Sequence, residues 1–179
     1  MTSKSSLFRT DTKALVGAVL LGIVFIIACQ ATGFIDNLLP WGKAGMYLLN
    51  GTVWSFFTAV ITLLYQQPAG IIAGEIEAVL AVFFSPLWLC FIFANALGSF
   101  CVSLLATKFT MDKWLHHFIC QLAVNIIGNT IVCLGLMKIY GLPGSVAAVE
   151  AIIITAVCTV LGTVIEKTAY TSLKKSGLM

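Results

Sequence analysis

The sequence predicts an all-α integral membrane protein with six transmembrane helices and both termini in the cytoplasm. Composition is the first reason: of 179 residues, 60% are hydrophobic and 9% are charged, and the mean hydropathy is +1.04. Ordinary soluble domains are roughly 25% charged, and a domain of ~150 residues buries only about 70% of the surface that its unfolded chain exposes. A soluble enzyme, a disordered protein and a nucleic-acid-binding protein are therefore excluded.

Six long apolar segments are the second reason. A membrane helix needs about 20 mostly apolar residues, and alternating strand patterns are absent, so helices rather than a β-barrel satisfy the backbone in lipid. We treat residues 1–179 as one transmembrane domain, with 1–12 as a cytoplasmic N-terminal segment and 167–179 as a cytoplasmic tail. The segments, of which the third is the shortest, are Lys13–Ala31, Ala44–Tyr65, Ala69–Phe84, Leu87–Thr107, Trp114–Tyr140 and Ser145–Glu166.

Turn-forming residues separate these segments in order. Proline disfavours helix at the residue before it, and glycine, asparagine and aspartate favour turns. The breaks are Phe34–Gly42 with Asp36, Asn37 and Pro40, then Gln66-Gln67-Pro68, Ser85-Pro86, the polar stretch Lys108–Lys113, and Gly141-Leu142-Pro143-Gly144.

The distribution of basic residues is the third reason. With six spans both termini share one side of the membrane, and cytoplasmic loops are enriched in lysine and arginine. The other side carries two basic residues, Lys43 and Lys138. The terminal side carries eight, which places both termini in the cytoplasm: Lys4, Arg9, Lys13, Lys108, Lys113, Lys167, Lys174 and Lys175.

The six cysteines are scattered singly through apolar segments and show no Cys-x-x-Cys or Cys/His metal spacing. We interpret them as small apolar residues inside helices, and we expect no metal site. Ile26-Ile27-Ala28-Cys29 follows a basic stretch and also reads as a lipoprotein cleavage site. Cleavage there would leave five spans.

Small residues form a stripe along each of two segments. In lipid, such residues let two helices approach closely. Each stripe therefore predicts either packing within the bundle or a docking surface for another membrane protein. The first segment carries Ala14, Ala18 and Gly22 at four-residue steps, and the third carries Gly70, Gly74 and Ala78.

Polar side chains also align inside the segments. Amide and ionisable side chains in membrane helices are costly and usually face a cavity, although hydrogen bonding between helices is the alternative. His116 and His117 lie near the cytoplasmic end, where an interfacial position is the alternative to a chemical role. The fifth segment places His117, Gln121, Asn125 and Asn129 at four-residue steps, and the fourth places Asn95, Ser99 and Ser103 likewise.

Carboxylates inside the segments extend this polar set, among them Glu75, Glu77 and Glu150. Residues two apart point to roughly opposite sides of a helix, so at most one of Glu75 and Glu77 faces a shared cavity, and the sequence leaves open which. A buried carboxylate needs a proton, a cation or a hydrogen-bond donor.

Aromatic planes, amides and carboxylates together suit a flat, nitrogen-rich heterocycle, because rings stack and carboxylates bind N–H groups. For the tryptophans, the alternative is anchoring at the membrane interface. Gln30 and Asn50 lie at a similar depth in the outer halves of the spans. The candidate substrate-binding residues are Trp41, Trp54, Glu75, Trp88, Asn95, Asn125, Asn129 and Glu150.

Motifs for catalysis are absent from the sequence. It contains no phosphate-binding G-x-x-x-x-G-K-[ST], no G-x-S-x-G and no H-E-x-x-H. We therefore predict no catalytic residues and no cofactor, and we expect any ATP hydrolysis to occur in partner subunits.

Two stretches carry a family resemblance. Ala14-Leu15-Val16-Gly17-Ala18 is similar to the Ala-x-x-x-Ala docking face of the substrate-binding (S) components of bacterial energy-coupling-factor (ECF) vitamin transporters. The stretch from Pro68 to Ala78 resembles the Pro-Gly-Ala…Glu stretch of the hydroxymethylpyrimidine (thiamine-precursor) subgroup. It departs from that pattern at Ala69-Gly70, and Asn95-Ala96-Leu97-Gly98-Ser99 replaces the glycine-rich segment of the next helix.

The resemblance implies a multi-pass subunit of the bacterial cell membrane that binds a vitamin-like heterocycle from outside. A transmembrane coupling protein and two ATP-binding-cassette ATPases would then drive uptake. The family's site lies toward the outer face, which by position implicates Trp41, Glu75, Asn95, Asn125, Asn129 and Glu150, while Ala14 and Ala18 would dock the partner.

Hydroxymethylpyrimidine, thiamine or a pyridoxine-like compound is the ligand that the resemblance implies. A stand-alone proton- or sodium-coupled carrier is the alternative function, and it would need Glu75 or Glu150 to titrate during turnover. A membrane enzyme that uses the His116–His117 pair is a third interpretation.

Overall fold

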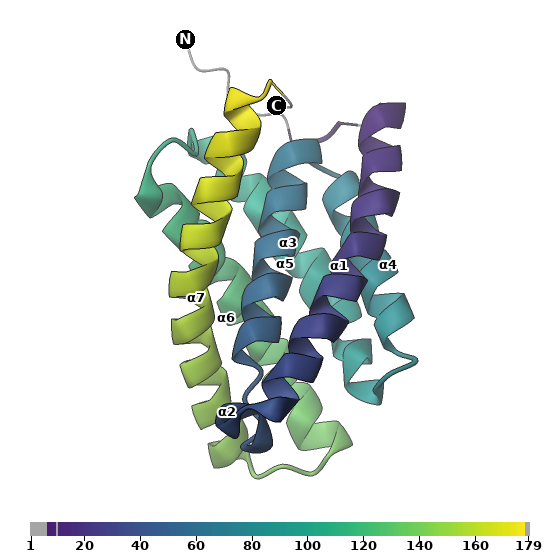
Figure 1. Ribbon diagram of the computed structural model, residues 1–179, viewed down its shortest axis with the longest axis vertical. Coiled ribbons are helices and arrows are strands. Elements are labelled where there is room, and N and C mark those ends of the chain that lie inside the picture. The colour runs from purple at the N-terminus through teal and green to yellow at the C-terminus, as the bar shows by residue number, and fades with distance from the viewer. Residues whose placement is uncertain (1–6, 10, 178–179) are drawn as a thin grey trace.

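The computed structural model describes residues 7–9 and 11–177, and in this part of the chain the regular elements are all helices. Figure 1 shows them as an antiparallel bundle. They are α1 (Thr12–Leu38), α2 (Pro40–Lys43), α3 (Leu48–Tyr65), α4 (Ala69–Ala81), the 3₁₀ turn η1 (Pro86–Trp88), α5 (Leu89–Lys108), α6 (Trp114–Ile139) and α7 (Gly144–Lys175).

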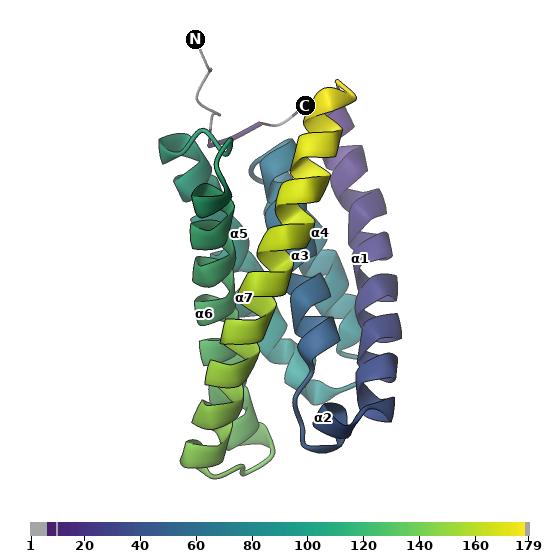
Figure 2. The same cartoon turned by 60° about the vertical axis from the view of Figure 1, so that its left-hand side comes forward.

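The bundle has two distinct ends. α1 begins and α7 ends at one of them, which we call the terminal end (Figures 1 and 2). The α3–α4 and α5–α6 connections also lie at the terminal end. The connections through α2, through η1 and between α6 and α7 lie at the opposite end.

In the described part of the chain, five helical stretches are long and apolar enough to cross a membrane, so the chain is a multi-pass membrane protein. These are α1, α3, η1 with α5, α6 and α7. The segment expected at Ala69–Phe84 forms only the 13-residue α4, about 20 Å long, against a hydrocarbon core of ~30 Å. The chain between α3 and α5 nevertheless leads from the terminal end to the opposite end (Figure 1).

α1 runs further than its sequence indicates, to Leu38 instead of Ala31. Asp36, expected in a break, is a buried helical residue. Its carboxylate accepts hydrogen bonds from the backbone N–H groups of Leu49 (3.1 Å) and Asn50 (2.8 Å) in the first turn of α3. These donors have no partner within their own helix, so Asp36 caps α3 from a distance and ties the end of α1 to it.

α7 is also longer than expected, because residues 167–175 continue the helix. Tyr170 and Leu173 pack against the core. Lys174 Nζ donates to Asp112 Oδ1 at 2.8 Å, and this hydrogen bond holds the pKa of Asp112 below its usual value. The expected cytoplasmic tail is therefore mostly an extension of the bundle.

The small-residue stripes are used inside the bundle. Ala14 and Ala18 have no exposed surface. A Cβ on Gly22 would lie 2.9 Å from the backbone oxygen of Ala73, so α1 and α4 touch backbone to backbone there. The stripe of Ala14, Ala18 and Gly22 is thus buried inside the bundle, with Gly22 against α4, whereas the resemblance implies an exposed docking surface.

Candidate functional site

A cavity of about 700 Å³ opens at the end opposite the termini, and we call this the cavity end. Its volume falls within the range typical of small-molecule sites. Every helix of the bundle except α2 and α4 contributes to its lining. Its polar and aromatic lining residues are Gln30, Phe34, Asn37, Tyr47, Asn50, Trp54, Phe84, Ser85, Trp88, Phe91, Asn129, Tyr140 and Glu150.

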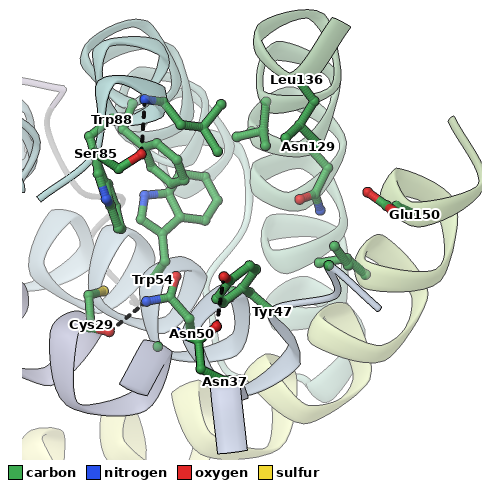
Figure 3. Close-up of a pocket in the computed structure, with 18 of the residues that line it drawn as sticks. Cys29, Asn37, Tyr47, Asn50, Trp54, Ser85, Trp88, Asn129, Leu136 and Glu150 are labelled. Carbon is green, nitrogen blue, oxygen red and sulfur yellow. Dashed lines mark hydrogen bonds between the residues drawn. The ribbon is translucent and has the colours of Figure 1, made fainter. Parts of the chain in front are cut away.

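One side of the cavity is an aromatic wall (Figure 3). The rings of Trp54 and Phe91 meet edge to face, with centroids 5.6 Å apart. Trp88 lies 4.3 Å from Phe91 at an interplanar angle of 40°. Such a wall offers flat π faces to a bound ring.

Trp54 is held by buried polar groups behind this wall. Its indole Nε1–H donates to Asn95 Oδ1 at 2.7 Å. The amide of Asn95 in turn donates to the Gly74 carbonyl (2.6 Å) and to Glu77 Oε2 (2.9 Å). The indole also packs against Gly128 on α6, where no larger side chain would fit. The orientation of Trp54 is therefore set by contacts with α5 and α6, and α4 supports it through Asn95.

Asn129 and Glu150 occupy the other side of the cavity, on α6 and α7 (Figure 3). The Asn129 amide donates to Thr155 Oγ1 at 2.9 Å. Glu150 is partly exposed, and its Oε1 would lie 3.2 Å from a Cβ on Gly45. Gly45 also has a φ of +86°, so its lack of a side chain both permits this turn and leaves room for the carboxylate.

The rim of the cavity supplies more polar atoms. Tyr47 Oη donates to Asn37 Oδ1 at 2.9 Å, and the Asn50 amide donates to the Cys29 carbonyl at 2.6 Å (Figure 3). Within the described chain the Gln30 Nε2 group is buried without a hydrogen-bond partner. An acceptor on a ligand would satisfy that donor.

The predicted binding residues fall into two groups. Trp54, Trp88, Asn129 and Glu150 line the cavity. The other four, Trp41, Glu75, Asn95 and Asn125, are not lining residues.

Each residue of the second group has another place. Asn95 lies behind Trp54. Trp41 donates through Nε1 to Asp36 Oδ1 at 2.8 Å and so supports the α1–α3 junction. Asn125 is buried deeper, donating to the Gln121 carbonyl at 2.9 Å. Of the two carboxylates on α4, Glu77 is fully buried beside Asn95, and Glu75 is only partly buried, so neither faces the cavity.

Sequence reasoning missed several lining residues. Tyr47, Ser85 and Tyr140 flank turns at the cavity end, and Ser85 Oγ lies 2.9 Å from Tyr140 Oη. A usable signal was present, because both tyrosines sit at the outer ends of predicted spans. Phe91 carried none, since a phenylalanine inside an apolar segment is indistinguishable from one that faces lipid.

From the cavity, the polar stripe of α6 continues toward the terminal end. His117, Gln121 and Asn125 are fully buried. His117 and Gln121 both bond to Glu166 on α7. Among the described residues, no group of three or more His, Cys, Asp or Glu side chains is arranged to hold a metal ion.

No protein-family model, curated protein or solved structure matches this chain. The function proposed for it therefore depends on the geometry of the cavity.

Proposed function

We propose that this chain is the substrate-binding membrane subunit of an ATP-driven importer, of the ECF S-component type, for a vitamin-like nitrogen heterocycle. The supporting observation is a cavity that combines an aromatic wall, amides and the Glu150 carboxylate at the end of the bundle away from both termini. In this proposal the host is bacterial, the terminal end faces the cytoplasm, and the cavity opens to the outside.

Charge supports this orientation. Arg9, Lys13, Lys108 and Lys113 lie at or beside helix boundaries of the terminal end, as do the basic residues of the last turns of α7. Lys138 lies in the last turn of α6, near the cavity end. This asymmetry matches the enrichment of cytoplasmic loops in basic residues. We count α4 with its flanking turns as a sixth crossing, shortened because it packs against α1, α3 and α5.

The ligand we expect is flat and carries both N–H donors and a ring acceptor. Stacking on Trp54 or Trp88 contributes about 0.5–1.5 kcal/mol beyond area burial. A hydrogen bond to the charged Glu150 adds about 1.5–3 kcal/mol. Hydroxymethylpyrimidine and thiamine offer this combination through an aminopyrimidine ring, and pyridoxine-like compounds offer hydroxyl donors beside a ring nitrogen. Gln30 Nε2 would bind the ring acceptor.

Uptake requires an energy source that this sequence does not encode, because it has no nucleotide-binding motif. We propose that a transmembrane coupling protein and two ATPases supply it. Since Ala14, Ala18 and Gly22 are buried in this conformation, the coupling protein would first meet the aliphatic outer face of α1, which includes Val16, Leu20 and Ile27.

Mass spectrometry of small molecules that survive purification from the native membrane tests the proposal most directly. A retained heterocycle should then quench tryptophan fluorescence in a titration. Trp54→Phe should reduce the quenching, whereas Trp114→Phe, a matched change at an exposed residue outside the cavity, should not. Failure of hydroxymethylpyrimidine, thiamine, pyridoxine and the co-purified compounds to bind would refute it.

A proton-coupled carrier is the second candidate, and one observation favours it. His117 and Glu166 form a fully buried pair between α6 and α7, of the kind found in proton pathways. Liposomes that contain only this chain distinguish the two functions. Accumulation driven by a pH gradient without any ATPase would support the carrier, and binding without accumulation would support the importer subunit.

A further inference from the structure

His117 lies in the first turns of α6 and Glu166 in the C-terminal part of α7, toward the terminal end, and neither residue lines the cavity. His117 Nδ1 lies 2.5 Å from Glu166 Oε1, and both side chains are fully buried. The other ring nitrogen, Nε2, lies 2.9 Å from the backbone oxygen of Met111 in the α5–α6 connection. The pair therefore joins α6, α7 and this connection.

Hydrogen-bond accounting requires a proton inside the pair. A backbone carbonyl only accepts, so His117 Nε2 carries a hydrogen. Nδ1 and Glu166 Oε1 cannot both be bare acceptors at 2.5 Å. One proton must lie between them, either on the imidazole or on the carboxyl. In both cases the pair has no net charge.

The surroundings offer a deprotonated pair one hydrogen-bond donor, the Gln121 amide, and no buried cation among the described residues. Gln121 Nε2 donates to Glu166 Oε2 at 2.5 Å and to the Ser55 carbonyl of α3 at 3.2 Å. In the described chain Glu166 has hydrogen bonds only from His117 and Gln121. The other titratable groups nearby are Tyr170 of α7 against the imidazole, Cys120 of α6, and, further out, Cys101 of α5 and the exposed Asp112–Lys174 pair.

We propose that His117 and Glu166 form a proton-binding site that keeps the terminal end of the bundle closed. Release of the proton to water leaves two acceptors facing each other and one uncompensated buried negative charge, which is strongly unfavourable. α6 and α7 then separate at this end. The inference stands independently of the proposed function, since it concerns the protein without ligand.

A row of polar side chains connects the His117–Glu166 pair with the cavity. Gln121 Oε1 lies 3.5 Å from the Asn125 amide, Thr155 Oγ1 lies 3.5 Å from the Asn125 carbonyl, and the cavity residue Asn129 donates to Thr155. If α6 and α7 separated at the terminal end, this row of polar side chains would line a path from the cavity to that end.

Nitrogen NMR of the full chain in phospholipid nanodiscs tests whether a proton is shared between His117 Nδ1 and Glu166. The chain has two histidines, so ¹⁵N-histidine labelling gives two sets of ring signals, which His116→Gln assigns. We expect His117 Nδ1 to show a shared, strongly deshielded proton at pH 7. A bare Nδ1 signal for His117 in the unmodified protein at pH 7 would overturn the proposal.

Glu166→Gln keeps the shape of the side chain and removes the titrating carboxyl. We expect the shared-proton signal to disappear in this variant and to persist in His116→Gln, the matched control, because His116 has no ion-pair partner among the described residues. A signal that survives Glu166→Gln contradicts the assignment.

Closure of the terminal end is tested separately at fixed pH by labelling Cys120, which is fully buried beside Glu166. In the test protein, Cys120 is the one cysteine that is kept, and the others are replaced by alanine. A reference protein keeps Cys158 alone, which is buried nearer the cavity. His117→Leu should speed maleimide labelling of Cys120 by roughly a hundredfold. The apolar pair His117→Leu with Glu166→Met should restore protection. Unchanged labelling of Cys120 in His117→Leu, or equal acceleration at Cys158, would refute closure by this pair.

Discussion

At the scale of single residues, some side chains line the cavity and others lie behind the lining and hold it in place. Asn95 uses its carbonyl oxygen for Trp54 and its amide for Gly74 and Glu77, so its hydrogen-bonding capacity is occupied inside the protein. Glu150 is only partly buried and faces the cavity. Helical spacing places both types of residue on inward faces but does not distinguish their depths.

Glu150→Gln should weaken ligand binding about 2–30-fold, because a charge-assisted hydrogen bond worth about 1.5–3 kcal/mol becomes a neutral one worth about 1 kcal/mol. Calorimetric titration with the retained heterocycle measures the change. Glu75→Gln is the matched control, since it alters a carboxylate on α4 outside the cavity lining. Equal losses in the two variants would show that Glu150 has no special role in binding.

Asn95→Leu should reduce both stability and affinity. The Trp54 N–H and the Glu77 carboxyl lose their partner while buried, which costs about 1–3 kcal/mol for each group left unsatisfied. Thermal unfolding and ligand titration provide the two readouts. Ser99→Ala, one turn further along α5 and also buried, removes a longer 3.3 Å bond to the Gly70 carbonyl and should leave affinity unchanged. A loss of affinity in Asn95→Leu without a change in Trp54 near-ultraviolet circular dichroism would indicate that Asn95 contacts the ligand directly.

At the scale of helices, capping from another element explains a boundary that the sequence misplaced. Aspartate and asparagine before a proline normally indicate a turn. Asp36 and Asn37 instead remain helical, because the Asp36 carboxylate is directed to the free N–H groups of α3. Local turn statistics contain no information about such a partner, which comes from a different helix.

Asp36→Ala should lower the free energy of unfolding by about 2–4 kcal/mol, because it leaves backbone donors of α3 and the Trp41 indole without their acceptor. The midpoint of thermal unfolding in detergent measures this loss. Asp11→Ala is the comparison: Asp11 caps α1 by accepting from the Ala14 N–H at 2.8 Å but is exposed, so its removal should cost about 1 kcal/mol or less. Equal costs would show that burial of the Asp36 cap adds nothing.

At the scale of the whole molecule, composition and periodicity predicted the helical fold, because that fold follows from the bilayer as solvent. They did not predict which side chains line the cavity and which lie behind that lining. Trp54 and Trp41 are equally apolar and flat, yet one faces the cavity and the other serves Asp36. That difference depends on which helices pack together, and α4 at 13 residues shows how far packing overrides an expected length.

The contact between α1 and α4 decides between packing and docking for the first small-residue stripe. Gly22→Val would bring a side chain against the Ala73 backbone, which cannot move away cheaply, so we expect a loss of about 1–3 kcal/mol in stability. Val19→Leu, on the exposed face of α1, is the matched change and should have little effect on stability. If the stripe served mainly as a docking face, Gly22→Val would abolish uptake in cells while the isolated protein kept its melting temperature. Loss of thermal stability in Gly22→Val alone would instead show that close approach of α1 to α4 holds the bundle together, so a coupling partner would have to bind elsewhere or displace α4.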